Sequence, residues 1–163
     1  MGAADEIRAG ERSKFEALEE AGLNNHLVEL FVFISSTGGN DIVGKQGDRR
    51  YNRLILKPNP QVELNRREII TQDGFQTASD AQLQGAFPEV LKGFEVILND
   101  AGQQTASVAI SKAYASAKEF RLDVEKTDYI LIDGERYVFR GGAYLNINKT
   151  ETVWKMKLLK ADK

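Results

Sequence analysis

The strongest constraint on the fold is the pair Asp133-Gly134, which separates two apolar segments, residues 128–132 and 135–139. A two-residue Asp-Gly connection favours a type I′ turn, because that turn needs a positive φ at both positions. The sequence therefore predicts an antiparallel hairpin over residues 128–139. Its register pairs two sets of facing residues: Ile130 with Tyr137, and Ile132 with Glu135.

Further segments alternate apolar with polar residues, as half-buried strands do. In residues 120–124, for example, Phe120, Leu122 and Val124 alternate with charged residues. Residues 72–85 are polar and contain a turn signal at Asp73-Gly74. Besides the hairpin, strands are predicted at residues 26–34, 53–56, 62–71, 94–98, 107–114, 120–124 and 153–159.

Residues 3–21 have the spacing of a helix. Ala4, Ile7, Phe15 and Leu18 fall on one face, and Gly22 stands where a C-terminal cap glycine is expected. The apolar stripe is narrow, so the helix needs something to pack against. That partner is either its own domain or a neighbouring subunit, to which residues 3–21 would bind as a contact arm.

The length and composition fit one globular domain with an appended arm. The chain has 163 residues, of which 42% are hydrophobic. We expect a mainly β protein, a small β-barrel or sandwich with an N-terminal α-helix and a long Gly-rich loop at residues 38–47. The expected division is a helical arm, 1–22, and a single β domain, 23–163, whose barrel-like part lies in the C-terminal half.

The composition also excludes several classes of protein. There is no cysteine, which rules out disulfides, thiolate metal sites and cysteine nucleophiles. The net charge of −2 shows no overall basic excess for nucleic acid. No apolar run is long enough to span a bilayer, and the first residues do not resemble a signal peptide. We therefore expect the chain to be made in the cytoplasm without membrane contact.

The loop from Gly39 to Lys45 matches the phosphate-binding pattern G-x-x-x-x-G-K. In that motif, glycine N–H groups hold the phosphates, and a following Ser or Thr binds Mg²⁺. Gln46 replaces that hydroxyl, and no apolar helix follows. We interpret the segment as a Gly-rich surface loop. A nucleotide-binding enzyme that uses Lys45 is the alternative.

No other pattern indicates catalysis. His26 is the single histidine, and no Asp or Ser lies nearby in register, so a structural role is favoured. The carboxylates are dispersed and do not form a calcium-loop pattern. We therefore expect no catalytic, cofactor-binding or metal-binding residues, and no enzyme. Six basic residues cluster around Tyr51: Arg49, Arg50, Arg53, Lys57, Arg66 and Arg67. Three interpretations are open for them, namely a solvated face, ion pairs with acids of a neighbouring protein, or contact with a phosphate backbone.

The segment Val124–Phe139, with its Asp133-Gly134 turn and Tyr137, precedes a closing strand Trp154-Lys155-Met156-Lys157-Leu158. Together they resemble the neck and head-completion proteins (head-tail connectors) of tailed bacteriophages. The resemblance implies a β-barrel virion protein that forms a homo-oligomeric ring, as a head-closure protein, adaptor or collar. The implied partners are further copies, portal and tail proteins, and DNA passing through the lumen. A monomeric ligand-binding β domain remains the other non-enzymatic interpretation.

Overall fold

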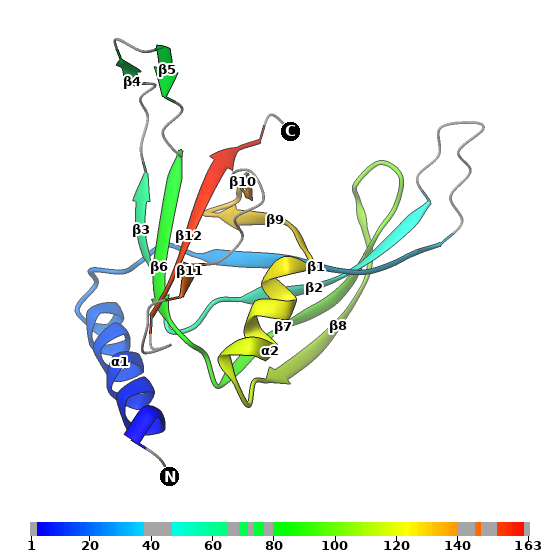
Figure 1. Cartoon of the computed structure of the whole chain (residues 1–163). Coiled ribbons are helices and arrows are strands. Elements are labelled where there is room, and N and C mark those ends of the chain that lie inside the picture. Colours follow the sequence, from blue (N-terminus) through cyan, green and yellow to red (C-terminus); the bar gives the residue numbers. More distant parts are fainter. Residues whose placement is uncertain are drawn as a thin grey trace.

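The computed structural model describes residues 3–37, 47–64, 69–71, 74–76, 80–139, 146–147 and 153–161. Two helices, α1 (Ala3–Glu20) and α2 (Ala117–Glu125), accompany a large sheet (Figure 1). The strands are β1 (Val28–Thr37), β2 (Asp48–Ile55), β3 (Gln61–Leu64), β4 (Ile69–Thr71), β5 (Gly74–Gln76), β6 (Ala81–Ala86), β7 (Val90–Leu98), β8 (Gln104–Ala113), β9 (Thr127–Ile132), β10 (Glu135–Phe139), β11 (Asn146–Ile147) and β12 (Val153–Lys160).

The main sheet follows the order β3-β6-β12-β10-β9-β1-β2-β7-β8, and every neighbouring pair is antiparallel. Strand β11 pairs with β12, while β4 and β5 pair with each other. Because this order contains nine strands, β3 and β8 run in the same direction, and joining them would require a parallel pair. The described sheet stays open between them.

The expected mainly β fold with an N-terminal helix is confirmed, but the sheet is not a closed barrel. A barrel confined to the C-terminal half was the wrong arrangement, because β1 and β2 lie in the middle of the sheet. Strand β1 separates β9 from β2 and binds both. The two halves of the chain are therefore interleaved.

The predicted hairpin is confirmed in position, register and turn. Strands β9 and β10 pair Ile130 with Tyr137 and Ile132 with Glu135. At the turn, Asp133 has a φ of 50° and Gly134 a φ of 85°. These two positive angles are the type I′ requirement that the Asp-Gly pair satisfies.

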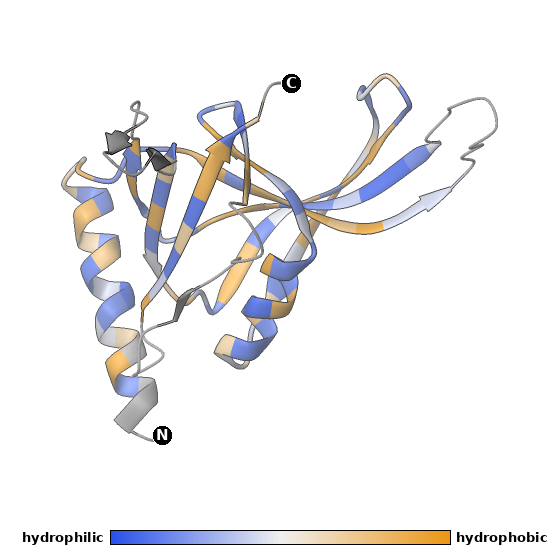
Figure 2. Ribbon diagram, turned by 45° about the horizontal axis from the view of Figure 1, so that its top comes forward, coloured by the Kyte–Doolittle hydropathy of each residue, from blue (hydrophilic) through white to orange (hydrophobic). Residues whose placement is uncertain are grey.

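The main core lies on the side of the sheet that α2 covers. Strands β1 and β12 contribute alternate residues to it: Val28, Leu30 and Val32 from β1, and Trp154, Met156 and Leu158 from β12. Hydrophobic and hydrophilic residues alternate along β12 (Figure 2). Trp154 is almost fully buried there, and its indole N–H donates to Ala86 O at 3.0 Å. The largest fully buried side chains are Trp154, Phe120, Leu30, Leu54, Leu83, Leu91, Ile130, Met156 and Leu158.

Residues 120–124 form part of α2, so the predicted strand is wrong. Ser116 caps the helix by accepting a hydrogen bond from Glu119 N, and the Glu119 carboxylate accepts one from Ala115 N. Phe120 and Val124 are four residues apart and share the buried face. Phe120 and Val124 fit the period of a strand and of a helix alike, whereas Leu122 fits only the strand and is exposed in α2. The capping residues decide in favour of the helix.

Two other strand predictions need correction. The polar segment 72–85 ends in β6, whose buried residues include Ala81 and Leu83. Small residues on the buried face made its period-two pattern hard to recognise. The strand predicted over 62–71 is two separate strands, β3 and β4.

Helix α1 lies on its own chain, which was one of the two expected arrangements. Phe15 is buried, Arg12 binds the Glu89 carboxylate at 2.8 Å, and Lys57 binds Glu19 at 2.5 Å. Gly22 ends the helix with a φ of 76° and donates to Glu19 O at 3.0 Å, as a cap glycine does. The helix is therefore tied to the β6–β7 connection and to the segment after β2.

Among the described residues, no helix is long and apolar enough to cross a membrane. The loop from Gly39 to Lys45 lies outside the described residues, as do Arg66 and Arg67. The nucleotide-binding alternative, which depends on Lys45, therefore stays a prediction.

Candidate functional site: the open edge of the sheet

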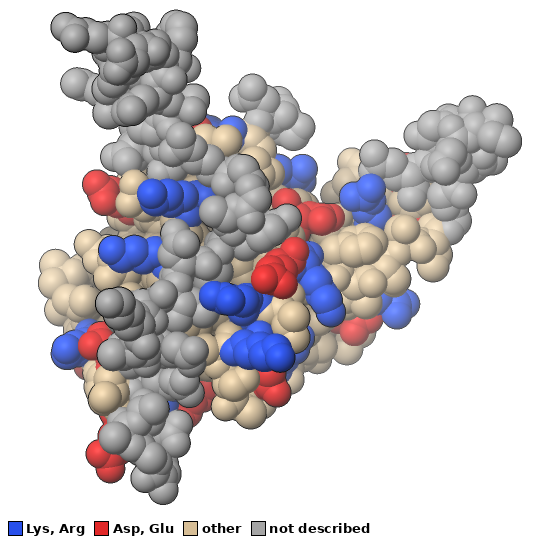
Figure 3. Space-filling model, viewed as in Figure 1, with Lys and Arg blue, Asp and Glu red and all other residues tan. Residues whose placement is uncertain are grey.

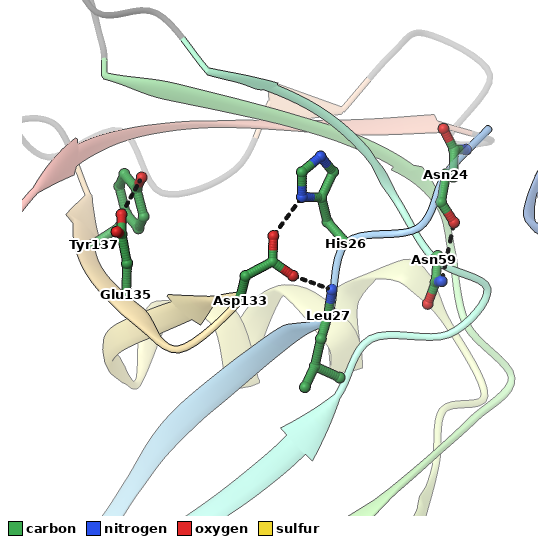
Figure 4. Close-up of polar contacts among 7 residues, drawn as sticks. All are labelled: Asn24, His26, Leu27, Asn59, Asp133, Glu135 and Tyr137. Atoms are coloured by element: carbon green, nitrogen blue, oxygen red, sulfur yellow. Dashed lines mark hydrogen bonds and ion pairs between the residues drawn. The ribbon is translucent and has the colours of Figure 1, made fainter. Parts of the chain in front are cut away.

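His26 has an acidic partner that the sequence did not indicate. Its Nδ1 lies 2.5 Å from Asp133 Oδ2, and the other carboxylate oxygen of Asp133 accepts a hydrogen bond from Leu27 N at 2.9 Å (Figure 4). The expectation that no Asp lies near His26 was wrong, because the two residues are 107 positions apart in the chain. These bonds attach the β9–β10 turn to the segment that leads into β1.

The electrostatics of this pair are those of a structural contact. Burial opposes ionisation of Asp133, but the hydrogen bonds from His26 and Leu27 N–H outweigh it and lower the pKa of the carboxyl. The side chain of Asp133 is half exposed. Figure 4 shows the imidazole turned to the turn carboxylate. The geometry therefore accounts for His26 as an anchor of the hairpin.

The basic residues of β2 are matched by acids of neighbouring strands. Arg53 binds Glu29, Arg50 binds Glu95 at 3.3 Å, and Arg49 lies 3.8 Å from Asp128. Arg53 also lies over the Phe31 ring, 5.5 Å from its centroid. The charges of these three arginines are therefore balanced by acids of the same chain. On the face drawn in Figure 3, basic and acidic side chains are interspersed.

A buried polar cluster joins α2 to β8. The Asp123 carboxylate accepts hydrogen bonds from the Tyr114 hydroxyl and from Lys112 Nζ, both at 2.6 Å. Burial raises the pKa of Tyr114, and the hydrogen bond to Asp123 adds to the shift, so the phenol stays a donor. Every member of the cluster has its partner within the cluster, which therefore holds α2 in place.

A cleft of about 350 Å³ separates α1 from the start of α2. Phe87 and Tyr114 contribute apolar surface, and Arg12 is its basic residue. The guanidinium of Arg12 already binds the Glu89 carboxylate at 2.8 Å and Phe87 O at 3.4 Å. A small ligand would have to compete with these internal bonds.

No group of three or more His, Asp or Glu side chains that could hold a metal ion occurs in the described part of the chain. The expectation of no catalytic, cofactor-binding or metal-binding residues stays a prediction. In these described segments the ionisable clusters have structural partners, which leaves the surface as the place for a functional contact.

Strand β8, at one end of the main sheet, is largely exposed. This strand has ten residues, eight of which are exposed, and among the described strands it pairs on one side only, with β7. Val108 is 65% exposed on β8, and Phe94 is 42% exposed on β7 beside it. In Figure 1, β7 and β8 form a long ribbon directed away from β3 and β6. An open row of backbone N–H and C=O groups results.

The features that normally protect such an edge are scarce in β8. Soluble proteins shorten edge strands or give them charges, prolines or bulges, since an open edge recruits other chains. Residues 104–111 have no charge and no proline, and the single register shift lies near the turn, between Ile97 and Leu98. Lys112 is the one charged residue, and it points to Asp123.

The pattern of 107–114 correctly predicted a strand here. Its position at the edge depends on the order of the whole sheet, which no local pattern reveals. No known protein family, characterised protein or solved structure matches the chain.

Proposed function

We propose that this protein is a structural subunit that works by joining protein chains. The observation that carries the proposal is β8, a long, uncharged and exposed strand at the sheet edge. Such an edge binds an extended segment of another chain through backbone hydrogen bonds. The protein would then need no catalytic residues.

The neck of a tailed bacteriophage is the assembly that we propose for it. The support is the resemblance of the β9–β10 hairpin and the closing strand β12 to neck proteins. The projecting β7–β8 ribbon gives such a subunit a means to reach a neighbour in a ring, and the portal and tail proteins would lie above and below that ring. DNA in the lumen would meet a surface whose described arginines on β2 are already paired with acids.

The test is incorporation into tail-less phage heads. Purified protein is added to the heads, and particle-bound protein is measured after sedimentation. A variant with lysines at two exposed positions of β8, Ser107→Lys/Ser111→Lys, is compared with a variant altered on the exposed face of α1, Glu16→Lys. We expect the wild type and the α1 variant to incorporate and the β8 variant to be lost.

Failure of all three proteins to incorporate would remove the neck proposal. A monomeric binding domain that uses the cleft beside Arg12 would then be the better interpretation. Equal incorporation of all three would retain the neck but reject β8 as the contact.

A further inference from the structure

The register of the β7–β8 pair identifies which backbone groups of β8 are open. Tyr114 N donates to Glu89 O at 2.8 Å, next to the pair formed by Ala113 and Val90. In an antiparallel pair, successive residues direct their N–H and C=O groups alternately toward and away from the partner strand. The even-numbered residues up to Tyr114 therefore bond to β7. The odd-numbered residues Ser107, Ala109 and Ser111 direct their backbone groups to the open edge.

The two ends of the sheet offer different ways for copies of this chain to join. Contact between β8 of one copy and β3 of the next, with the faces of the two sheets aligned as in one continuous sheet, would be parallel, and β3 has only four residues. Contact between β8 and β8 of a second copy, about a two-fold axis, is antiparallel and extends over as many as ten residues. The second arrangement gives the longer ladder with the better hydrogen-bond geometry.

The charges of β8 favour the same arrangement. Like charges opposite each other destabilise a strand pair. Residues 104–111 have none, and the ammonium group of Lys112 is turned to Asp123 of its own chain. The strand can therefore face a copy of itself in any register without repulsion between charged side chains.

We infer that, in the free protein, two copies pair through β8 in an antiparallel ladder about a two-fold axis, which makes one continuous sheet. The inference rests on the proposed role of β8 as a contact surface, and it names the partner as a second copy. Because a two-fold contact closes with two copies, this dimer is a form of the unassembled protein, distinct from a ring. It covers the open edge until another chain takes that place.

The first experiment measures mass by light scattering and sedimentation across concentrations in the micromolar range. Ala109→Pro removes an N–H group that points to the open edge and no hydrogen bond to β7. Ala109→Val is the matched control, since it keeps the N–H at the same exposed position. We expect the wild type and the valine variant to form dimers of similar affinity. For the proline variant, the dissociation constant of the dimer should rise roughly tenfold or more. Melting temperatures show whether each variant is folded.

The second experiment tests whether the partner of β8 is another copy of the chain. Ser107→Lys/Ser111→Lys and Ser107→Glu/Ser111→Glu each place like charges on the facing strands. Each variant alone should be monomeric, and an equimolar mixture should recover the dimer, with the effect reduced at high salt.

Three results would overturn the inference: a monomeric wild type throughout, a dimer unaffected by Ala109→Pro in a folded protein, or no recovery in the mixture. None of these depends on incorporation into heads. A monomer that still incorporates through β8 refutes the dimer alone, while a β8 dimer that fails to incorporate refutes the neck.

Discussion

Strands β12 and β8 are alike in sequence pattern and opposite in environment. Strand β12 alternates apolar residues with lysines from Trp154 to Leu158, and β8 places Val108 and Ile110 among small or polar neighbours. Strand β12 lies between β6 and β10, and its alternate residues are buried. Strand β8 has one neighbour among the strands that the structure describes, and it is exposed along most of its length. The place of a strand in the sheet therefore decides whether its apolar residues are buried or exposed. In β12 the apolar residues stabilise the core, whereas in β8 Ile110 packs against the core and Val108 remains available for contact.

The largest effect on folding is expected from Trp154→Ala in β12. The side chain is 1% exposed, and its removal leaves a cavity against α2 and the backbone of Gly85. We expect a loss of about 3–5 kcal/mol in the free energy of unfolding, measured with urea. Val108→Ala in β8 is the control and should cost far less. A loss below that of the control would contradict the assignment of β12 to the core.

Gly93→Ala tests how closely β7, the neighbour of β8, lies against β2 in the middle of the sheet. A Cβ at this position would lie 2.0 Å from Arg53 O, a backbone atom of β2 that cannot easily move. We expect a destabilisation of roughly 1–3 kcal/mol or more, visible as a lower melting temperature. Gly10→Ala in α1, where nothing lies within 4 Å, should instead be stabilising. Equal melting temperatures for the two variants would show that β2 and β7 are not this close.

Gly134→Val examines the turn next to β10, the neighbour of β12. Gly134 has a φ of 85°, and a β-branched residue resists that conformation even though no atom lies within 4 Å of the added Cβ. The expected cost is about 1–2 kcal/mol. Gly134→Asn should cost less, because asparagine accepts a left-handed backbone. An unchanged melting temperature for the valine variant would rule out the type I′ turn.

The Asp133 carboxylate, in the turn between β9 and β10, makes the free energy of unfolding depend on pH. Its pKa is lowered in the folded protein, so its contribution is present above the unfolded value of about 3.9 and is lost as the pH falls through the folded pKa. The difference in unfolding free energy between wild type and Asp133→Asn should therefore shrink between about pH 6 and pH 3. Because the side chain is half exposed, we expect a difference below about 1 kcal/mol. A difference that grows toward acid pH would have the wrong sign.

The smallest effect on folding is expected from Val108→Lys in β8. Val108 is 65% exposed, so the free energy of unfolding should change by no more than about 0.5 kcal/mol. A lysine on an open edge opposes strand pairing, so association should weaken all the same. Sedimentation and urea unfolding on the same samples separate the two effects. A large loss of stability would mean that β8 is covered within the monomer.

The sequence predicted the elements whose signals are local. The Asp133-Gly134 pair predicted the turn and its register, and Gly22 predicted the end of α1. Helix α2 was missed because Phe120 and Val124 fit the strand period as well as the helical one, and β6 was missed because most of its buried positions hold alanine or glycine.

The candidate site and the His26–Asp133 contact depend on residues that are distant in the chain. The carboxylate of Asp133 reaches His26 because β1 pairs with β9, which no local pattern announces. Strand β8 was predicted, yet its open edge follows from the order of all the other strands. Local patterns specify elements, and long-range pairing specifies which of them are left uncovered.

The interleaved order of the strands has a consequence for synthesis of the chain on the ribosome. Strand β12 is the last described strand to emerge, yet it lies between β6 and β10, and β1 must wait for β9. Long-range pairing of this kind slows folding. Until β12 arrives, β6 and β10 each lack a neighbour, and the nascent chain exposes additional strand edges besides β8. Chaperone demand during production should therefore be greatest before β12 is complete.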